Sequence, residues 1–286
     1  MSDREEAPAP IRIYRYFRLL LHLLAGLLTV ALLFPAYGRE RRWRAIQRWA
    51  AGILSILNVR LDVKGAPPES GRPLLGVANH VSWLDIYVIH AAWRVRFVAK
   101  AEVRDWPAIG WLSAKTGTLF IERGRHRHAA HINRAIHEAF ALGDAIAVFP
   151  EGTTTQGTEL RRFHASLLQP AVDENALVMP VALRYAHADG SVDVTPSYVG
   201  DTSLMESIVA IVSQRQTRAE LAFLAPIDAS GRRRREVAAA AQAAVAAALR
   251  LPDPGSAPGT GAGLPGASPT AGVPTDSRCP VPSDSR

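Results

Sequence analysis

A histidine and an aspartate stand five positions apart, directly after an apolar run. Residues 79–85 read Asn-His-Val-Ser-Trp-Leu-Asp, and residues 73–78 before them have the pattern of a buried strand. On one continuous helix His80 and Asp85 would point about 140° apart, so they can meet only if the backbone at His80 is not helical. We therefore expect His80 in a loop between a strand and a helix. The Asp85 carboxylate would hold one ring nitrogen and leave the other as a base.

Ser82 supplies a reason for the break in the helix. Ser-x-x-Asp at 82–85 is an N-terminal capping pattern, which predicts Ser82 as the N-cap and Asp85 in the first turn. The alternative is that Asp85 only caps the helix and His80 is an ordinary loop residue. One short pattern arises easily by chance, so the choice depends on the rest of the chain.

Two further polar stretches follow predicted strands, at the edge where a parallel sheet forms its ligand crevice. Arg123 ends the first, and a guanidinium binds phosphate through two parallel hydrogen bonds. In the second, Pro150 ends a strand, and Gly152 lets the backbone approach a ligand closely. The hydroxyls of residues 153–155 can donate to phosphate oxygens. The alternatives are an exposed arginine in a turn and a threonine-rich turn with a solvated Glu151.

Composition limits the partners. The chain has 286 residues, a formal net charge of +7 and a single cysteine, Cys279, which excludes a disulfide framework and a cysteine-based metal site. No other cluster of metal-ligating residues is apparent, so we expect no metal. The positive charge favours anionic partners. The basic residues flank apolar segments and form no nucleic-acid recognition motif, so an anionic membrane is favoured over nucleic acid.

The N-terminal region predicts membrane association. Residues 19–36 carry no formal charge over eighteen positions and lie between two arginine clusters, which is about the minimum length for a spanning helix. The acidic N-terminus and the lack of an Ala-x-Ala site argue against a cleavable signal peptide. A spanning helix and a helix in the membrane interface both remain open. Residues 43–57 predict an amphipathic helix, packed either on the core or, as we favour here, on anionic lipid through Trp43 and Trp49.

Beyond residue 58 the chain alternates apolar runs with helical patterns, which predicts an α/β fold with a mostly parallel central sheet flanked by helices. We expect three regions: membrane-associated helices at 1–58, the α/β domain at 59–250 and a disordered tail at 251–286 that is poor in core-forming residues. The last strands follow in quick succession, which allows antiparallel pairing. The predicted strands are 59–64, 73–78, 95–99, 117–121, 145–149, 177–185, 191–199 and 217–224. The predicted helices of this region are 83–92, 106–114, 128–142, 164–174, 203–212 and 236–250.

Four short motifs carry a resemblance. They are His-x4-Asp at 80–85, Phe-Ile-x-Arg at 120–123, Pro-Glu-Gly-Thr at 150–153 and Val-Met-Pro-Val at 178–181. Their order and spacing are similar to the four blocks of the glycerolipid acyltransferases, and over about 59–225 the chain resembles the bacterial 1-acyl-sn-glycerol-3-phosphate acyltransferases. One block alone is weak evidence, whereas four in order are specific.

The resemblance implies a reaction. A fatty acyl group would move from a thioester, acyl-carrier protein or coenzyme A, to the sn-2 hydroxyl of 1-acyl-glycerol-3-phosphate. The product would be phosphatidic acid, made on the cytoplasmic face of the cytoplasmic membrane without a cofactor. His80 would be the general base and Asp85 its orienting partner. The remaining site residues that the resemblance implies are Arg123, Glu151, Gly152 and Thr153 around the acceptor, and Lys100 near the reacting centre.

One position departs from the pattern. The third block often continues with arginine, where this chain has Thr154. The change removes a cation from the expected phosphate pocket and leaves lyso-ornithine lipid, which has no phosphate, as an alternative acceptor. A lipid hydrolase is a further alternative. It is disfavoured because no Gly-x-Ser-x-Gly motif is present, and Ser82 would have to serve as nucleophile.

Overall fold

The computed structural model describes residues 6–121 and 126–255, and for residues 121 and 126–133 it describes the backbone alone. Arg123 and Cys279 lie outside the described residues. The helices are α1 (Ala9–Leu28), α2 (Arg39–Ile56), α3 (Asp85–Ala92), α4 (Ile109–Lys115), α5 (His126–Ala141), α6 (Gln169–Asp173), α7 (Leu204–Ser213) and α8 (Arg234–Leu249). Single turns of π or 3₁₀ helix lie at Thr29–Leu33, Phe34–Ala36, Ala101–Asp105 and Ala165–Leu168.

The strands form one mixed sheet in the order β1-β7-β6-β2-β5-β3-β4, with β8 beside β6. They are β1 (Val59–Lys64), β2 (Leu74–Ala78), β3 (Val95–Lys100), β4 (Leu119–Ile121), β5 (Ala145–Val148), β6 (Leu177–Ala186), β7 (Thr217–Phe223) and β8 (Ile227–Asp228). The strands β6, β2, β5, β3 and β4 are parallel, whereas β7 and β8 pair antiparallel with β6. The carboxyl ends of the five parallel strands therefore meet at one edge of the sheet.

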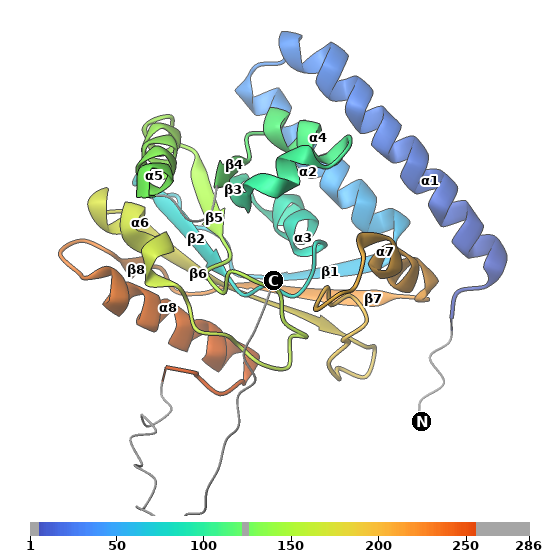
Figure 1. Ribbon diagram of the computed structural model, residues 1–286. Coiled ribbons are helices and arrows are strands. Elements are labelled where there is room, and N and C mark those ends of the chain that lie inside the picture. The colour runs from blue at the N-terminus through green and yellow to red at the C-terminus, as the bar shows by residue number, and fades with distance from the viewer. Residues whose placement is uncertain (1–5, 122–125, 256–286) are drawn as a thin grey trace, which may run out of the picture. The chain divides into compact units, whose positions relative to one another are not determined.

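Helices cover both faces of this sheet (Figure 1). One core lies between the sheet and α2, α3 and α7, and the other between the sheet and α5, α6 and α8. The central strand β6 serves both, because Met179, Val181 and Leu183 lie in the first core while Val178 and Ala182 lie in the second. A strand buried on both sides needs a nearly continuous apolar sequence, which is what β6 has.

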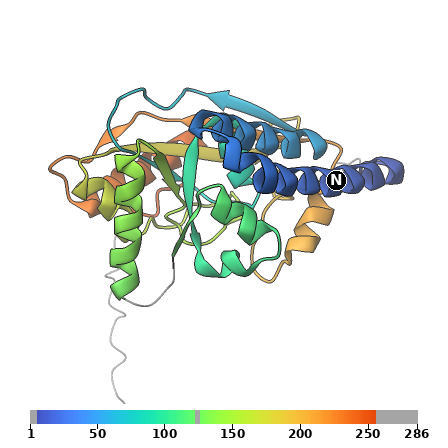
Figure 2. The ribbon, with the colours of Figure 1, turned by 90° about the horizontal axis from the view of Figure 1, so that it is seen from above.

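The helices α1 and α2 pack closely against each other and run side by side in Figure 2. A Cβ atom on Gly26 would come within 2.5 Å of Trp49, and one on Gly52 within 2.5 Å of His22. The imidazole of His22 stacks on Trp49, and the indole N–H donates to the His22 carbonyl over 3.0 Å. Small residues at the crossing thus allow two large aromatic groups to pair across it.

The apolar face of α2 is covered by protein, which corrects the lipid contact favoured for its tryptophans. Trp43, Ile46 and Ile53 are buried, and α2 packs on α3, the helix that begins at Asp85. An amphipathic pattern predicts only that one face of the helix is shielded from water. It does not predict whether protein or lipid shields that face. The arginines of the opposite face are exposed.

The predicted fold class is confirmed, as is the antiparallel pairing of the last long strands. The predicted strand 191–199 is wrong. Apart from one isolated bridge at Val192, the segment is irregular with one turn at residues 195–196, and Asp193 accepts from the Thr195 N–H while the Ser197 hydroxyl donates to the Val194 carbonyl. Short polar side chains and Pro196 compete with ladder bonds there. The division into regions at residues 58 and 250 stays a prediction.

Candidate active site

His80 and Asp85 meet at the carboxyl end of β2. The Asp85 Oδ2 atom lies 2.8 Å from His80 Nδ1 and also accepts the backbone N–H groups of Val81 (2.7 Å) and Ser82 (3.0 Å). The chain therefore folds back over the first turn of α3, as the five-residue spacing predicts. Asp85 is fully buried, whereas the imidazole is 19% exposed. The carboxylate lies behind the ring, and the ring reaches solvent.

Ser82 is not the N-cap that the capping pattern predicts. The helix begins at Asp85, after Leu84, and the Ser82 hydroxyl accepts the Leu84 N–H over 3.3 Å instead. The reverse half of the capping pattern is present, because the Asp85 side chain accepts the Ser82 N–H. The carboxylate thus organises the loop and holds the histidine at the same time.

The hydrogen bonds determine the tautomer of His80. The Tyr185 hydroxyl donates to Asp85 Oδ1 over 2.7 Å, so both carboxylate oxygens are occupied as acceptors. An acceptor-only carboxylate requires that His80 Nδ1 carries the hydrogen. The Nε2 lone pair is then available, and Nε2 has no hydrogen-bond partner among the described residues.

A row of rings supports the imidazole. His80 stacks on Phe149 with ring centroids 3.9 Å apart and planes within 11°, and Phe149 stacks on Phe97. The buried His90 meets the Phe97 ring edge to face. Burial lowers the pKa of His90 to about 4, so it is neutral at pH 7. The face of Phe149 fixes the plane of the His80 ring and can stabilise a positive charge on it.

Glu151 lies under the histidine loop rather than in solvent. Glu151 is 3% exposed, and its carboxylate accepts the His80 N–H and the Arg161 N–H, each over 2.8 Å. Burial raises the pKa of Glu151 to about 7, although these two backbone donors act in the opposite direction. Thr155 adds a second link, since its N–H donates to the His80 carbonyl over 2.9 Å. Glu151 and Thr155 therefore hold both backbone groups of His80, the N–H and the carbonyl.

The raised pKa of Glu151 predicts a pH-dependent stability. Folding raises it from 4.5 to about 7, so the folded state holds a proton that the unfolded state releases. The stability from this group is fully present below about pH 4.5 and is lost as pH rises through about 7. The variant Glu151→Gln cannot titrate, so its free energy of unfolding should rise relative to wild type across this range. Urea denaturation of both proteins from about pH 5 to about pH 8 measures the difference. A constant difference would contradict the assignment.

The other predicted site residues are placed as follows. Gly152 has a positive φ of 69°, and its N–H closes a turn onto the Phe149 carbonyl. Thr153 is exposed, and the Thr154 hydroxyl donates to the Tyr198 carbonyl. Lys100 is exposed at the carboxyl end of β3, the same edge of the sheet as His80.

Three residues of the site were not predicted. Tyr185 and Phe149 contact the two members of the pair, and Asn79 bonds both backbone groups of Leu183, which ties the loop to β6. Asn79 and Phe149 stand beside predicted motifs, so proximity could have indicated them. Tyr185 lies inside a strand pattern that gives no such signal.

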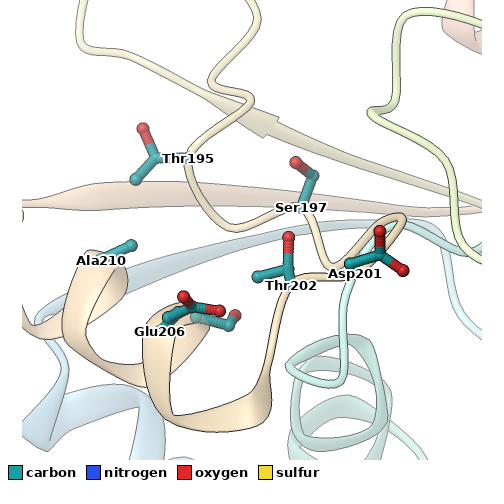
Figure 3. A pocket seen from close by; sticks show the side chains of 7 residues that line it. Thr195, Ser197, Asp201, Thr202, Glu206 and Ala210 are labelled. Atoms are coloured by element: carbon teal, nitrogen blue, oxygen red, sulfur yellow. The ribbon is translucent and has the colours of Figure 1, made fainter.

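A polar cavity of about 620 Å³ lies between α7 and the loop before it (Figure 3). It adjoins the histidine loop, because the Trp83 indole donates to the Ser207 hydroxyl in its lining over 3.0 Å. Asp201 and Glu206 bring carboxylates to it, and the bond from the Ser203 N–H lowers the pKa of Glu206. Within the described part of the chain, no group of three or more His, Cys, Asp or Glu side chains could hold a metal ion.

Comparison with known proteins gives consistent matches. A family model described as Acyltransferase matches residues 60–184. The lyso-ornithine lipid O-acyltransferase of Pseudomonas aeruginosa is 38% identical over 215 residues, covering 75% of this chain and 80% of the relative. The 1-acyl-sn-glycerol-3-phosphate acyltransferase of Neisseria meningitidis is 38% identical over 191 residues, covering 67% of this chain and 74% of the relative.

A solved structure has the same fold. It is the 1-acyl-sn-glycerophosphate acyltransferase of Thermotoga maritima, with a TM-score of 0.63, 21% identity, and coverage of 84% of this chain and 93% of that chain. The matched family region contains His80, Asp85 and Glu151 and ends one residue before Tyr185.

Proposed function

Because the chain belongs to the acyltransferase family, we propose that it transfers a fatty acyl group from a thioester to the sn-2 hydroxyl of 1-acyl-glycerol-3-phosphate. It is an O-acyltransferase for acceptors of the lysolipid type. The donor is acyl-carrier protein or coenzyme A carrying the acyl chain, and the product is phosphatidic acid. The observation that carries the mechanism is the bond between His80 Nδ1 and the buried Asp85 carboxylate.

The reaction follows from the free Nε2 atom of His80. An alcohol is a weak nucleophile at neutral pH, so Nε2 takes the hydroxyl proton while the oxygen attacks the thioester carbonyl carbon. A carbon–oxygen bond forms, and the carbonyl electron pair moves to its oxygen. When the tetrahedral intermediate collapses, the carbon–sulfur bond breaks and the sulfur takes the proton from the imidazolium. The products are an ester and a free thiol.

The surroundings support each charge that develops. The Asp85 carboxylate stabilises the imidazolium, and the Phe149 ring face lies against it. Lys100, exposed at the same edge of the sheet as Gly152 and Thr153, would supply positive charge near the reacting centre. Arg123, which lies outside the described residues, is the group that we expect to bind the acceptor phosphate. In this proposal Glu151 acts mainly by holding the backbone of His80.

Lyso-ornithine lipid is the second candidate acceptor. Thr154 stands where the family pattern often has arginine, and its hydroxyl is occupied by the Tyr198 carbonyl. The polar cavity beside α7 carries Asp201 and Glu206, which suit an ammonium group better than a phosphate. The Pseudomonas aeruginosa relative is named for this acceptor.

A competition assay tests the proposal. Purified full-length protein receives equal amounts of lysophosphatidate and lyso-ornithine lipid, with acyl-carrier-protein or coenzyme A thioester, and mass spectrometry measures the two diacyl products. We expect phosphatidic acid to dominate, and Thr154→Arg to increase its share. Dominant diacyl ornithine lipid would favour the second candidate, and the absence of any diacyl product would refute the acyl transfer.

We place the protein on the cytoplasmic face of the membrane, with α1 in the interface. Among the described residues one helical stretch, Ala9–Ala36, is long and apolar enough to cross a bilayer. Three observations favour the interface. Buried Arg15 donates to the Val212, Gln214 and Arg215 carbonyls, α1 packs along α2, and a cavity of about 260 Å³ on α2 is lined by Tyr37 and three arginines. Such arginines suit anionic headgroups.

The exposed side of α1 predicts a specific effect on membrane binding. Leu28 on α1 and Leu142 after α5 are equally exposed, at 59% and 60%. If α1 lies in lipid, Leu28→Asn should lower partitioning onto anionic vesicles about 10- to 100-fold, the worth of burying one leucine side chain. Leu142→Asn, the matched control, should leave it unchanged. Vesicle co-sedimentation measures both, and equal binding of the two variants would contradict the placement.

A further inference from the structure

Tyr185 bonds the carboxylate oxygen of Asp85 that His80 does not bond. The two residues are 100 positions apart, yet the Tyr185 hydroxyl lies 2.7 Å from Asp85 Oδ1. Both side chains are buried, at 1% and 0% exposure. The contact arises because β6 runs parallel beside β2, which brings its carboxyl end to the loop that carries His80.

The two carboxylate oxygens are held very unequally. Oδ2 accepts from His80 Nδ1 and from two backbone N–H groups. Among the described residues, Tyr185 is the only donor to Oδ1. Without the hydroxyl, a buried oxygen would lose its sole partner, and the carboxylate would turn or take up a proton to relieve that loss. Either change weakens the bond that orients the imidazole.

We propose that Tyr185 is a positioning residue for acyl transfer, which acts by holding the Asp85 carboxylate with Oδ2 toward His80. The inference rests on the proposed role of His80. Tyr185 is buried and bonds Asp85 rather than the imidazole, so it would act through Asp85 and not on a substrate.

The hydroxyl is suited to this role at any working pH. Burial, together with the charge of Asp85, raises the pKa of Tyr185 well above its ordinary value. The group therefore stays protonated and always donates. Phenylalanine has nearly the same shape, so Tyr185→Phe removes the donor and leaves the packing of the core in place.

A kinetic comparison tests the proposal. Tyr185→Phe should lower kcat about 10- to 100-fold, the loss expected for one hydrogen bond to a charged group, with KM for both substrates unchanged. Tyr87→Phe is the matched control, because Tyr87 lies on α3 and makes ring contacts with Trp49 and Trp83 rather than a bond to Asp85. It should keep wild-type kcat. In the Asp85→Asn background, Tyr185→Phe should lower kcat little further, because both substitutions disrupt the same Tyr185–Asp85–His80 network.

A second readout needs no substrate, so it separates this inference from the proposed function. In the proton NMR spectrum of the unsubstituted protein, we expect a downfield signal from His80 Nδ1–H, assigned by its loss in His80→Ala. It should shift or broaden in Tyr185→Phe and stay in place in Tyr87→Phe. A signal identical in all Tyr185 and Tyr87 variants, or a wild-type kcat for Tyr185→Phe, would overturn the inference. If the wild-type protein transfers no acyl group but the His80 Nδ1–H signal still changes in Tyr185→Phe, only the proposed function would be refuted.

Discussion

His80→Ala should abolish acyl transfer while leaving the protein folded. A positioned base contributes roughly 10²- to 10⁴-fold to such a reaction, and no other group among the described residues is placed to replace it. The stability should change little, because Asp85 Oδ2 keeps the Val81 and Ser82 N–H groups after the imidazole is removed. Initial rates with saturating lysolipid, together with the thermal unfolding temperature, measure both effects.

His164→Ala is the matched control for that experiment. His164 follows the third block and is exposed, and its bonds among the described residues are made by its backbone: the N–H donates to the Pro150 carbonyl, and the carbonyl accepts the Leu167 N–H. Alanine keeps both backbone bonds, so the control should retain wild-type turnover. Near-normal turnover in His80→Ala, or an equal loss in His164→Ala, would show that His80 is not the base.

Asp85→Ala should remove both activity and stability. Four donors converge on this buried carboxylate, from His80, Val81, Ser82 and Tyr185, and alanine leaves all of them without an acceptor. Breaking a buried charged network by removing one partner costs about 3–5 kcal/mol. The free energy of unfolding in urea should therefore fall by this amount, and transfer should fall at least as far as in His80→Ala.

Asp85→Asn separates the two roles of the carboxylate. The amide keeps one oxygen where the backbone N–H groups converge, so the loss of stability should be smaller than for alanine. It lacks the charge that stabilises the imidazolium, so activity should stay low. Asp85→Ala with the stability of His80→Ala would contradict the four-donor network, since only the loss of these bonds distinguishes the two variants.

The alternation of apolar runs and helical patterns was enough to predict the fold class, and the family resemblance from four motifs is confirmed. The edge pairing of β1 with β7 was not predictable in this way, because Val59 and Thr217 are far apart in sequence and nothing local links them. The surroundings of α2 were predicted wrongly for a related reason. The same apolar helix face is suited to packing on a protein core and on a lipid surface, so the sequence pattern does not distinguish the two.

The site shows the same limit at the level of side chains. The contact between His80 and Asp85 followed from a spacing of five and a non-helical loop, which are local properties. Tyr185 depends on the register of β6 against β2, and in a buried strand a tyrosine looks like any β-forming residue. Glu151 was expected at the acceptor, and its burial against the His80 N–H depends on how two loops meet.

The most direct test of acyl transfer to a lysolipid is the stoichiometry of thioester cleavage by the wild-type protein. Acyl thioester is supplied with and without lysophosphatidate, and free thiol, diacyl product and free fatty acid are measured over time. We expect thiol release to require the lysolipid and to equal the diacyl product mole for mole. Thiol release at the same rate without any lysolipid, with free fatty acid as the product, would contradict this expectation and identify a hydrolase.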